Sequence, residues 1–117
     1  MTAVYIESDD TQKHIWKIER IWALAEHLDI IEIPIESIVG IDAVTWFSEE
    51  HPPTVRSVAD HARRIQEADL SFPPILTARN RVFDGMHRIA KHLMLGKKTI
   101  RVKRFDKDPV PDQKIKL

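Results

Sequence analysis

The residues with the most distinctive chemistry in this chain form one run, Asp84–Gly85–Met86–His87–Arg88. The two residues ahead of it, Val82 and Phe83, are typical of a short strand. Behind the run, apolar residues recur at helical spacing until Gly96, a typical helix-ending residue. The run therefore lies where a strand turns into a helix.

This position favours an anion site. Glycine lets a backbone or a ligand approach closely, and the first amides of a helix have no acceptor within the helix. The helix dipole and two side chains that can carry positive charge, His87 and Arg88, suit a phosphate. We therefore expect phosphate groups to bind at Gly85, Met86, His87 and Arg88. The alternative is that His87 and Arg88 form a solvated pair on the polar face of the helix.

Asp84 has two expected roles, which do not exclude each other. Directly before the helix, its side chain can serve as the N-cap. Its carboxylate can also hold a magnesium ion or orient a substrate hydroxyl, since carboxylates are the usual protein ligands of that ion. Asp84 is therefore both a candidate catalytic residue and a candidate metal ligand.

A second group of chemically active residues lies in the segment 41–53, which has no secondary-structure period and is expected to be a loop. It carries Trp46 and Phe47, and aromatic residues in a loop often line a ligand pocket. Glu49 or Glu50 could accept the proton of an attacking hydroxyl beside a transferred phosphoryl group. The alternative is that both glutamates only keep the loop soluble.

The composition is that of one globular domain. The chain has 117 residues, of which 43% are hydrophobic and 31% charged, and its 18 basic and 18 acidic residues balance. A dedicated nucleic-acid binder usually has a basic excess. The chain contains no cysteine, which excludes disulfides and thiolate chemistry. Nothing resembles a signal peptide or a membrane span, so a cytoplasmic location is expected.

The N-terminal third is expected to contain a short edge strand at 3–6 and a helix capped by Thr11 that runs to about Leu28. Trp16 and Trp22 would lie on this helix as core or interface anchors. Alternating isoleucines at 31–35 are typical of a half-buried strand.

The remainder is expected to alternate between helices and strands. A capping box at Ser57 starts the next helix, although Thr54 could start it earlier; its buried stripe would be Val58, Ala62 and Ile65, with Arg63 and Arg64 in water. The later elements are strands at 75–77 and 82–83 joined by a turn, a final strand at 99–105, and a solvated tail after 106. This order predicts an α+β fold, with helices packed on a small mixed sheet.

The motif and its context resemble the ParB/sulfiredoxin superfamily. The resemblance rests on Pro74–Thr77, Val82–Ala90 and the closing strand at 100–102. It implies a nucleotide-binding core at residues 30–105, preceded by an N-terminal strand and helix extension at 1–29 and followed by a C-terminal tail at 106–117. In such proteins the segment equivalent to Gly85–Arg88 binds nucleotide phosphates.

The branches of this superfamily differ in their further requirements. Sulfiredoxins use a catalytic cysteine where this chain has Met86, so sulfiredoxin chemistry is excluded. ParB proteins have an Arg-rich version of the motif and a following helix-turn-helix domain. Free serine kinases carry an Asp-Gly-His-His-Arg type motif and a loop glutamate, and this chain is closest to them in motif.

The resemblance thus implies a phosphotransferase that uses ATP or ADP with Mg²⁺ and acts on a small hydroxyl-bearing molecule, or a nucleotide hydrolase. Three alternatives stay open: a ParB-like DNA-binding module, a ParB-like nuclease, and a non-catalytic nucleotide-binding regulator that forms a homodimer through its first helix. The cations that could serve nucleic acid are Lys97, Lys98, Arg101, Lys103 and Arg104.

Overall fold

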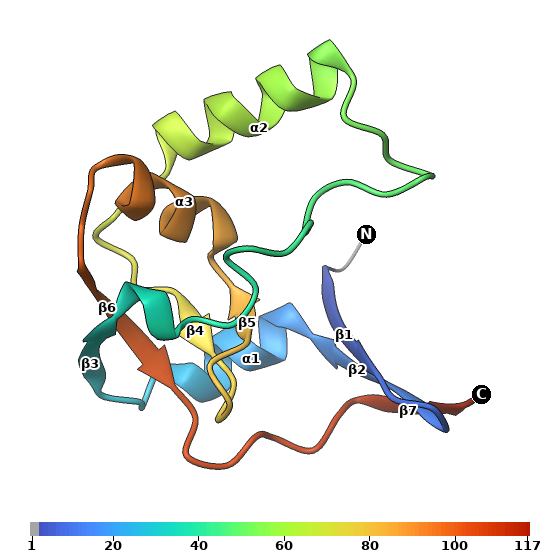
Figure 1. Ribbon diagram of the computed structural model, residues 1–117. Coiled ribbons are helices and arrows are strands. Elements are labelled where there is room, and N and C mark those ends of the chain that lie inside the picture. The colour runs from blue at the N-terminus through green and yellow to red at the C-terminus, as the bar shows by residue number, and fades with distance from the viewer. Residues whose placement is uncertain (1–2) are drawn as a thin grey trace.

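The computed structural model describes residues 3–117, which fold into an α+β structure with two small sheets (Figure 1). The elements in chain order are β1 (Val4–Ser8), β2 (Gln12–Lys17), α1 (Ile18–Ala25), β3 (Ile30–Pro34), the short 3-10 helix η1 (Ile35–Ser37), α2 (Val55–Glu67), β4 (Ile75–Leu76), β5 (Val82–Asp84), α3 (Met86–Met94), β6 (Thr99–Arg104) and β7 (Gln113–Lys116).

The central sheet has the strand order β3-β6-β4-β5. β6 pairs with β4 in parallel, whereas the pairs β3–β6 and β4–β5 are antiparallel. The expectation of a small mixed sheet is therefore confirmed. The parallel pair arises because the chain passes from β4 through the β5 hairpin strand and α3 before it enters β6.

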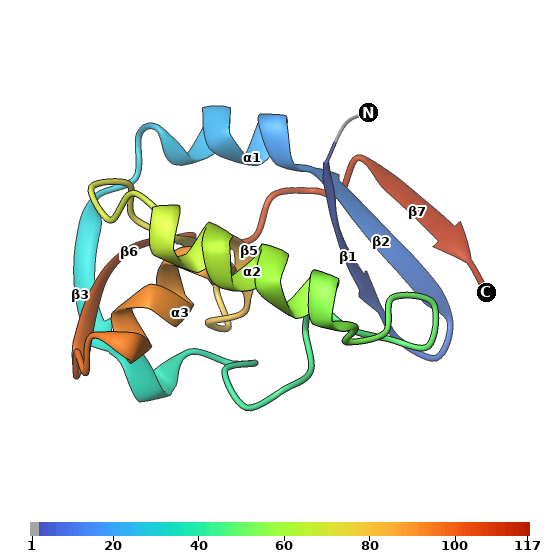
Figure 2. The same ribbon diagram turned by 90° about the horizontal axis from the view of Figure 1, so that it is seen from above.

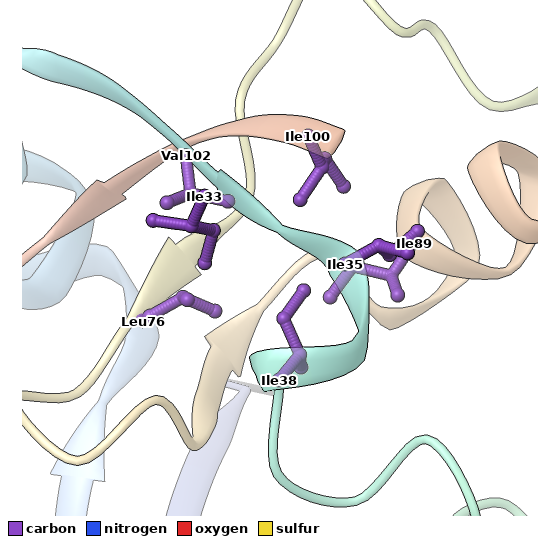
Figure 3. Close-up of a cluster of buried hydrophobic side chains, with 7 residues drawn as sticks. All are labelled: Ile33, Ile35, Ile38, Leu76, Ile89, Ile100 and Val102. Carbon is purple, nitrogen blue, oxygen red and sulfur yellow. The ribbon is translucent and has the colours of Figure 1, made fainter. Parts of the chain in front are cut away.

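The central sheet contributes to two hydrophobic clusters, one on each face, although outward-facing residues of β3 and β6 such as Glu32 and Arg101 are exposed. One face packs against α3 through the aliphatic cluster shown in Figure 3: Ile33, Ile35, Ile38, Leu76, Ile89, Ile100 and Val102. The other face packs against β2 and α1 through an aromatic-rich cluster: Trp16, Ile21, Ala25, Ile75, Phe83 and Phe105. Consecutive residues such as Ile75 and Leu76 enter opposite clusters because side chains alternate along a strand.

α3 ends as its sequence indicates. Gly96 adopts a positive φ of 72°, and its amide donates to the Leu93 carbonyl. The next amide, of Lys97, donates to the His92 carbonyl at 3.1 Å. This pair of bonds satisfies carbonyls that the last turn of a helix leaves free.

The expected helix from Thr11 to Leu28 is wrong in its first part. Residues Gln12–Lys17 form β2, and only Ile18–Ala25 are helical. Thr11 caps no helix, because its amide and hydroxyl donate to Asp9 Oδ1 in the turn between β1 and β2. β2 is the middle strand of its sheet, and pairing on both edges outweighs the helical spacing of its apolar residues.

The second sheet, of order β1-β2-β7, joins the two ends of the chain (Figure 2). The expected edge strand at 3–6 is present as β1, and the segment expected to be a solvated tail ends in an exposed strand, β7, at residues 113–116. The indole Nε1 of Trp16 donates to the Pro109 carbonyl at 2.8 Å, and the Lys17 amide donates to Asp112 Oδ2 at 2.8 Å. These bonds hold the C-terminal segment against β2.

α2 lies on the outer side of α3 and is the least buried helix (Figures 1 and 2). Its N-cap is Thr54, whose hydroxyl accepts a hydrogen bond from the Ser57 amide at 3.1 Å, so the earlier of the two expected starts is the correct one. The expected buried stripe is wrong: Val58 and Ala62 are exposed, and Ile65 is only half-buried. The helix turns a different face, with His61 and Ile65, toward the protein.

We predict that Ile89→Ala lowers the free energy of unfolding by about 2–5 kcal/mol, because it leaves a cavity in the aliphatic cluster. Met94→Ala, on the same helix, is the matched control: Met94 is 66% exposed, so its loss should change stability by less than about 0.5 kcal/mol. Urea unfolding of the two variants measures both values. Equal losses would contradict the placement of this cluster.

Candidate functional site

The candidate site is built around the start of α3. β5 ends at Asp84, Gly85 adopts a positive φ of 110°, and the helix begins at Met86. A Cβ added at Gly85 would lie 2.9 Å from Pro74 Cβ, so both the backbone conformation and the packing require glycine here. Gly85 is itself the N-cap, and no side chain caps the helix. The expected N-cap role of Asp84 is therefore wrong, because this residue still belongs to the strand.

The carboxylate of Asp84 connects α1 to α3. Its Oδ2 accepts a hydrogen bond from Trp22 Nε1 at 2.7 Å and another from Arg88 Nη2 at 3.2 Å. Within residues 3–117 its other oxygen, Oδ1, accepts no hydrogen bond. Oδ2 of Asp84 thus already accepts two hydrogen bonds from the protein, whereas Oδ1 remains available to a ligand.

Arg88 is held mainly by the protein itself. Its Nη1 donates to the carbonyls of Phe72 and Pro73 at 3.1 and 3.3 Å, in addition to the ion pair with Asp84. These bonds fix the segment ahead of β4 against α3. They leave only some of the guanidinium N–H groups for an anion.

A cavity of about 590 Å³, the α3 cavity, opens at this helix start. Its wall includes the whole run Asp84–Arg88, together with Arg64 of α2 and Asp69. The volume lies within the range of about 300–1,000 Å³ that is usual for small-molecule sites. The expected phosphate residues therefore line one cavity, and α2 contributes a cation to it.

The charges of this cavity have both signs. Hydrogen bonds from the side chain and amide of Ser71 hold the pKa of Asp69 below its usual range, so its carboxylate is ionised. Arg64 and Arg88 supply positive charge on other parts of the wall. An anionic ligand would need to approach the arginines and the amides of α3 rather than Asp69.

Beside the cavity, two histidines and a tryptophan form a stacked group. His61 Nδ1 and His87 Nε2 are 2.8 Å apart and share a hydrogen bond. The ring of Trp46 is stacked on both imidazoles, at centroid distances of 4.6 Å to His61 and 4.5 Å to His87. The group therefore joins the loop at 41–53, α2 and α3 at the edge of the α3 cavity.

The environment of His87 disfavours its charged form. Burial, then the neighbouring His61 and then the positive charge of Arg64 hold the pKa of His87 below the ordinary histidine value. His87 therefore remains neutral at neutral pH. It contributes a hydrogen bond and a stacking surface rather than a charge.

The two loop glutamates are placed apart from the run Asp84–Arg88. Glu49 and Glu50 are exposed, and neither lines the α3 cavity. The aromatic residues of the same loop do line a cavity of about 330 Å³, formed by Trp46 and Phe47 with α3 residues that include Met86. The side chain of Met86 packs against the aliphatic cluster, so only its backbone amide is suited to an anion.

The basic cluster expected along the last strand is divided by the fold. Lys103 Nζ donates to the Ala25 carbonyl at 3.1 Å, and Arg104 Nη1 donates to Asn80 Oδ1 at 2.8 Å. Lys97, Lys98 and Arg101 remain exposed. The cluster therefore does not present all its cations on one surface.

Sequence reasoning missed Arg64 and His61 as residues of this site. The mixed-charge stretch around Arg64 predicts a solvated side chain, and Arg64 is indeed exposed. His61, Arg64 and Ala68 are spaced at three and four residues, which places them on one helix face. That spacing was the available signal, but the apolar stripe of Val58 and Ala62 pointed to a different face.

Residues 3–117 contain no group of three histidine, cysteine or acidic side chains arranged to hold a metal ion. No helix within the same residues has the length and apolar character needed to cross a membrane. Comparison with models of known protein families, with curated proteins and with solved structures gives no match.

We predict that the free energy of unfolding decreases as the pH falls from about 7.5 to about 5. The folded pKa of His87 is depressed, so the unfolded chain binds the proton more tightly. The contribution of His87 is complete above about pH 6.5, the usual histidine pKa, and is lost as the pH falls through the lower folded value. His87→Phe should reduce the loss of unfolding free energy between about pH 7.5 and about pH 5 in urea titrations.

The variant should keep some of this dependence, because burial and Lys97 also lower the pKa of His92. Equal losses in the variant and the wild type would show that His87 does not contribute.

We also predict that Gly85→Ala is more damaging than Gly96→Ala. Both glycines have a positive φ, and this costs an alanine about 1 kcal/mol. Only at Gly85 does the new methyl group meet other atoms, which should add about 1–3 kcal/mol. Thermal or urea unfolding measures the difference. Equal destabilisation by the two variants would contradict the close contact with Pro74.

Proposed function

We propose that this chain is a nucleotide-binding protein of the ParB/sulfiredoxin type, with the nucleotide phosphates at the start of α3. One observation carries the proposal: the uncapped helix start at Gly85 opens into a cavity whose wall also carries Arg64. The amides of the first turn of a helix have no intrahelical acceptor, and its dipole favours an anion.

The proposed contacts differ in kind. The amides from Gly85 to Arg88 would cradle phosphate oxygens, and Arg64 would pair with them from α2 as the less constrained cation. His87 would donate a neutral hydrogen bond, and Arg88 would use the N–H groups that Phe72, Pro73 and Asp84 leave free. Charge-assisted bonds of this kind are the stronger ones in phosphate binding.

Mg²⁺ would accompany the nucleotide. This ion is commonly held by one or two carboxylates together with substrate phosphates and water, so a preassembled group of ligands is not required. Asp84 Oδ1 is the proposed protein ligand, because Oδ2 already accepts bonds from Trp22 and Arg88. The ion would offset the negative charge of Asp69 beside the phosphates.

The proposed reaction is transfer of a terminal phosphoryl group of ATP or ADP to a small molecule with a hydroxyl group. The hydroxyl oxygen would form the new bond to phosphorus, the bond to the bridging oxygen would break, and Glu49 or Glu50 would take the hydroxyl proton. Because neither glutamate lines the α3 cavity, the loop would have to approach the ligand. The same observation favours a second candidate function, a regulator that binds nucleotide without turnover.

The decisive experiment is calorimetric titration with ATP, ADP and CTP, with and without Mg²⁺. We expect Arg64→Ala to weaken nucleotide binding at least about tenfold, the effect of losing hydrogen bonds to a charged group. Arg63→Ala is the matched control: the neighbouring arginine pairs with Asp60 at 3.1 Å and does not line the α3 cavity. Its affinity should equal that of the wild type.

Binding that is equal in the wild type and Arg64→Ala would reject the proposed phosphate site. If nucleotide binds, release of ADP or AMP in the presence of a panel of hydroxyl acceptors separates the enzyme from the regulator. Glu49→Gln and Glu50→Gln then test the base: the variant that loses turnover but keeps its affinity identifies it.

A further inference from the structure

A second cavity, the α1 cavity, lies between α1 and the central sheet and has a volume of about 770 Å³. Its wall includes Trp22 and Ala25 from α1, Glu26 directly after that helix, Ile75 of β4, and Phe72. Most of these side chains are apolar, with only a few polar groups among them. This is the usual composition of a site for an uncharged organic ring.

The α1 and α3 cavities are neighbours. Phe72, Asp84 and Arg88 line both of them. The ion pair of Asp84 with Arg88 is therefore the partition between a site suited to an anion and a site suited to an apolar group. A ligand that carries both kinds of group can cross this partition and occupy both cavities.

Two aromatic side chains of the α1 cavity are unusually exposed. Trp22 is 53% exposed and Phe72 is 62% exposed. Although it faces solvent, the Trp22 indole is fixed by its 2.7 Å hydrogen bond to Asp84. A fixed aromatic face offers stacking area without the entropy cost of first ordering the side chain.

The polar groups of this cavity suit a ring that carries an amino group. Lys103 Nζ is already used by the Ala25 and Glu26 carbonyls, which it reaches at 3.1 and 3.5 Å at the end of α1. Glu26 itself is exposed and lines the cavity, and the side chain of this residue ends in a carboxylate. It can only accept hydrogen bonds when ionised, so it would pair with a donor such as an exocyclic amine.

We infer that the α1 cavity binds the nucleobase of the ligand whose phosphates lie in the α3 cavity, and that the base carries an exocyclic amino group, as adenine and cytosine do. Trp22 and Phe72 supply its stacking surface, and Glu26 accepts from its amino group. This inference rests on the proposed function, because it assigns the two parts of one nucleotide to the two sides of the Asp84–Arg88 pair.

The test compares three ligands by calorimetry in the presence of Mg²⁺: ATP, inosine triphosphate and inorganic tripolyphosphate. Trp22→Leu should weaken ATP binding about tenfold, which is the usual effect of losing one stacked aromatic residue, and should weaken tripolyphosphate binding far less, since only the hydrogen bond to Asp84 is lost from the phosphate side. Phe72→Leu should act in the same direction and breaks no side-chain hydrogen bond. Inosine triphosphate, which has an oxo group in place of the amino group, should bind the wild type several-fold more weakly than ATP.

The outcomes separate this inference from the proposed function. If ATP binds no better than tripolyphosphate and both Trp22→Leu and Phe72→Leu leave its affinity unchanged, the base site is rejected and the phosphate site stands. If tripolyphosphate does not bind and Arg64→Ala has no effect, while Trp22→Leu still weakens ATP binding, the phosphate site is rejected and the base site stands. If Trp22→Leu instead converts a dimer into a monomer in sedimentation without changing ATP affinity, the exposed ring belongs to an interface between two copies, and the inference is overturned.

Discussion

The arrangement of the candidate site depends on one partly exposed carboxylate, Asp84, whose Oδ2 accepts two hydrogen bonds. One bond comes from Trp22 in α1 and the other from Arg88 in α3, and Arg88 in turn binds the carbonyls of Phe72 and Pro73. A single carboxylate oxygen thus links the first helix, the last residue of β5, the site helix and the segment ahead of β4. Both flanking cavities take their shared wall from this network. Because hydrogen bonds to a charged acceptor are stronger than neutral ones, the wall is well suited to remain in place when a ligand enters.

The other side of the site is held differently. α2 contributes no fully buried side chain and is attached through polar contacts and stacked rings. Lys91 Nζ of α3 donates to the carbonyls of Gln66 and Ala68 at 2.7 and 2.9 Å, and His61 shares a hydrogen bond with His87. Elements with little apolar burial are those that open locally at low free-energy cost. The helix that carries Arg64 is therefore the part of the site best able to move, whereas α1, which carries Trp22, is held to the core by the buried residues Ile18, Ile21 and Ala25.

Sequence reasoning was most accurate where neighbouring residues decide the structure. The hairpin of β4 and β5, the turn at Gly85 and the end of α3 at Gly96 all follow from residues within a few positions of each other. The same reasoning failed for Gln12–Lys17, whose apolar spacing fits a helix but whose two partner strands lie at opposite ends of the chain. It also failed for the N-cap of α3, because pairing of Asp84 with Ile75 across the hairpin keeps Asp84 in the strand.

The amino-acid sequence alone determined that a strand, a glycine and a helix follow one another at 82–94, and therefore that unpaired amides occur there. Local steric limits and the hydrogen-bond pattern of a helix start are sufficient for that result. The tertiary structure decided which charges surround those amides. In the folded chain Arg88 donates a hydrogen bond to the Phe72 carbonyl, and Arg64 lines the α3 cavity. Glu49 and Glu50 do not line this cavity. These choices depend on contacts between residues far apart in the chain, which periodicity and spacing do not encode.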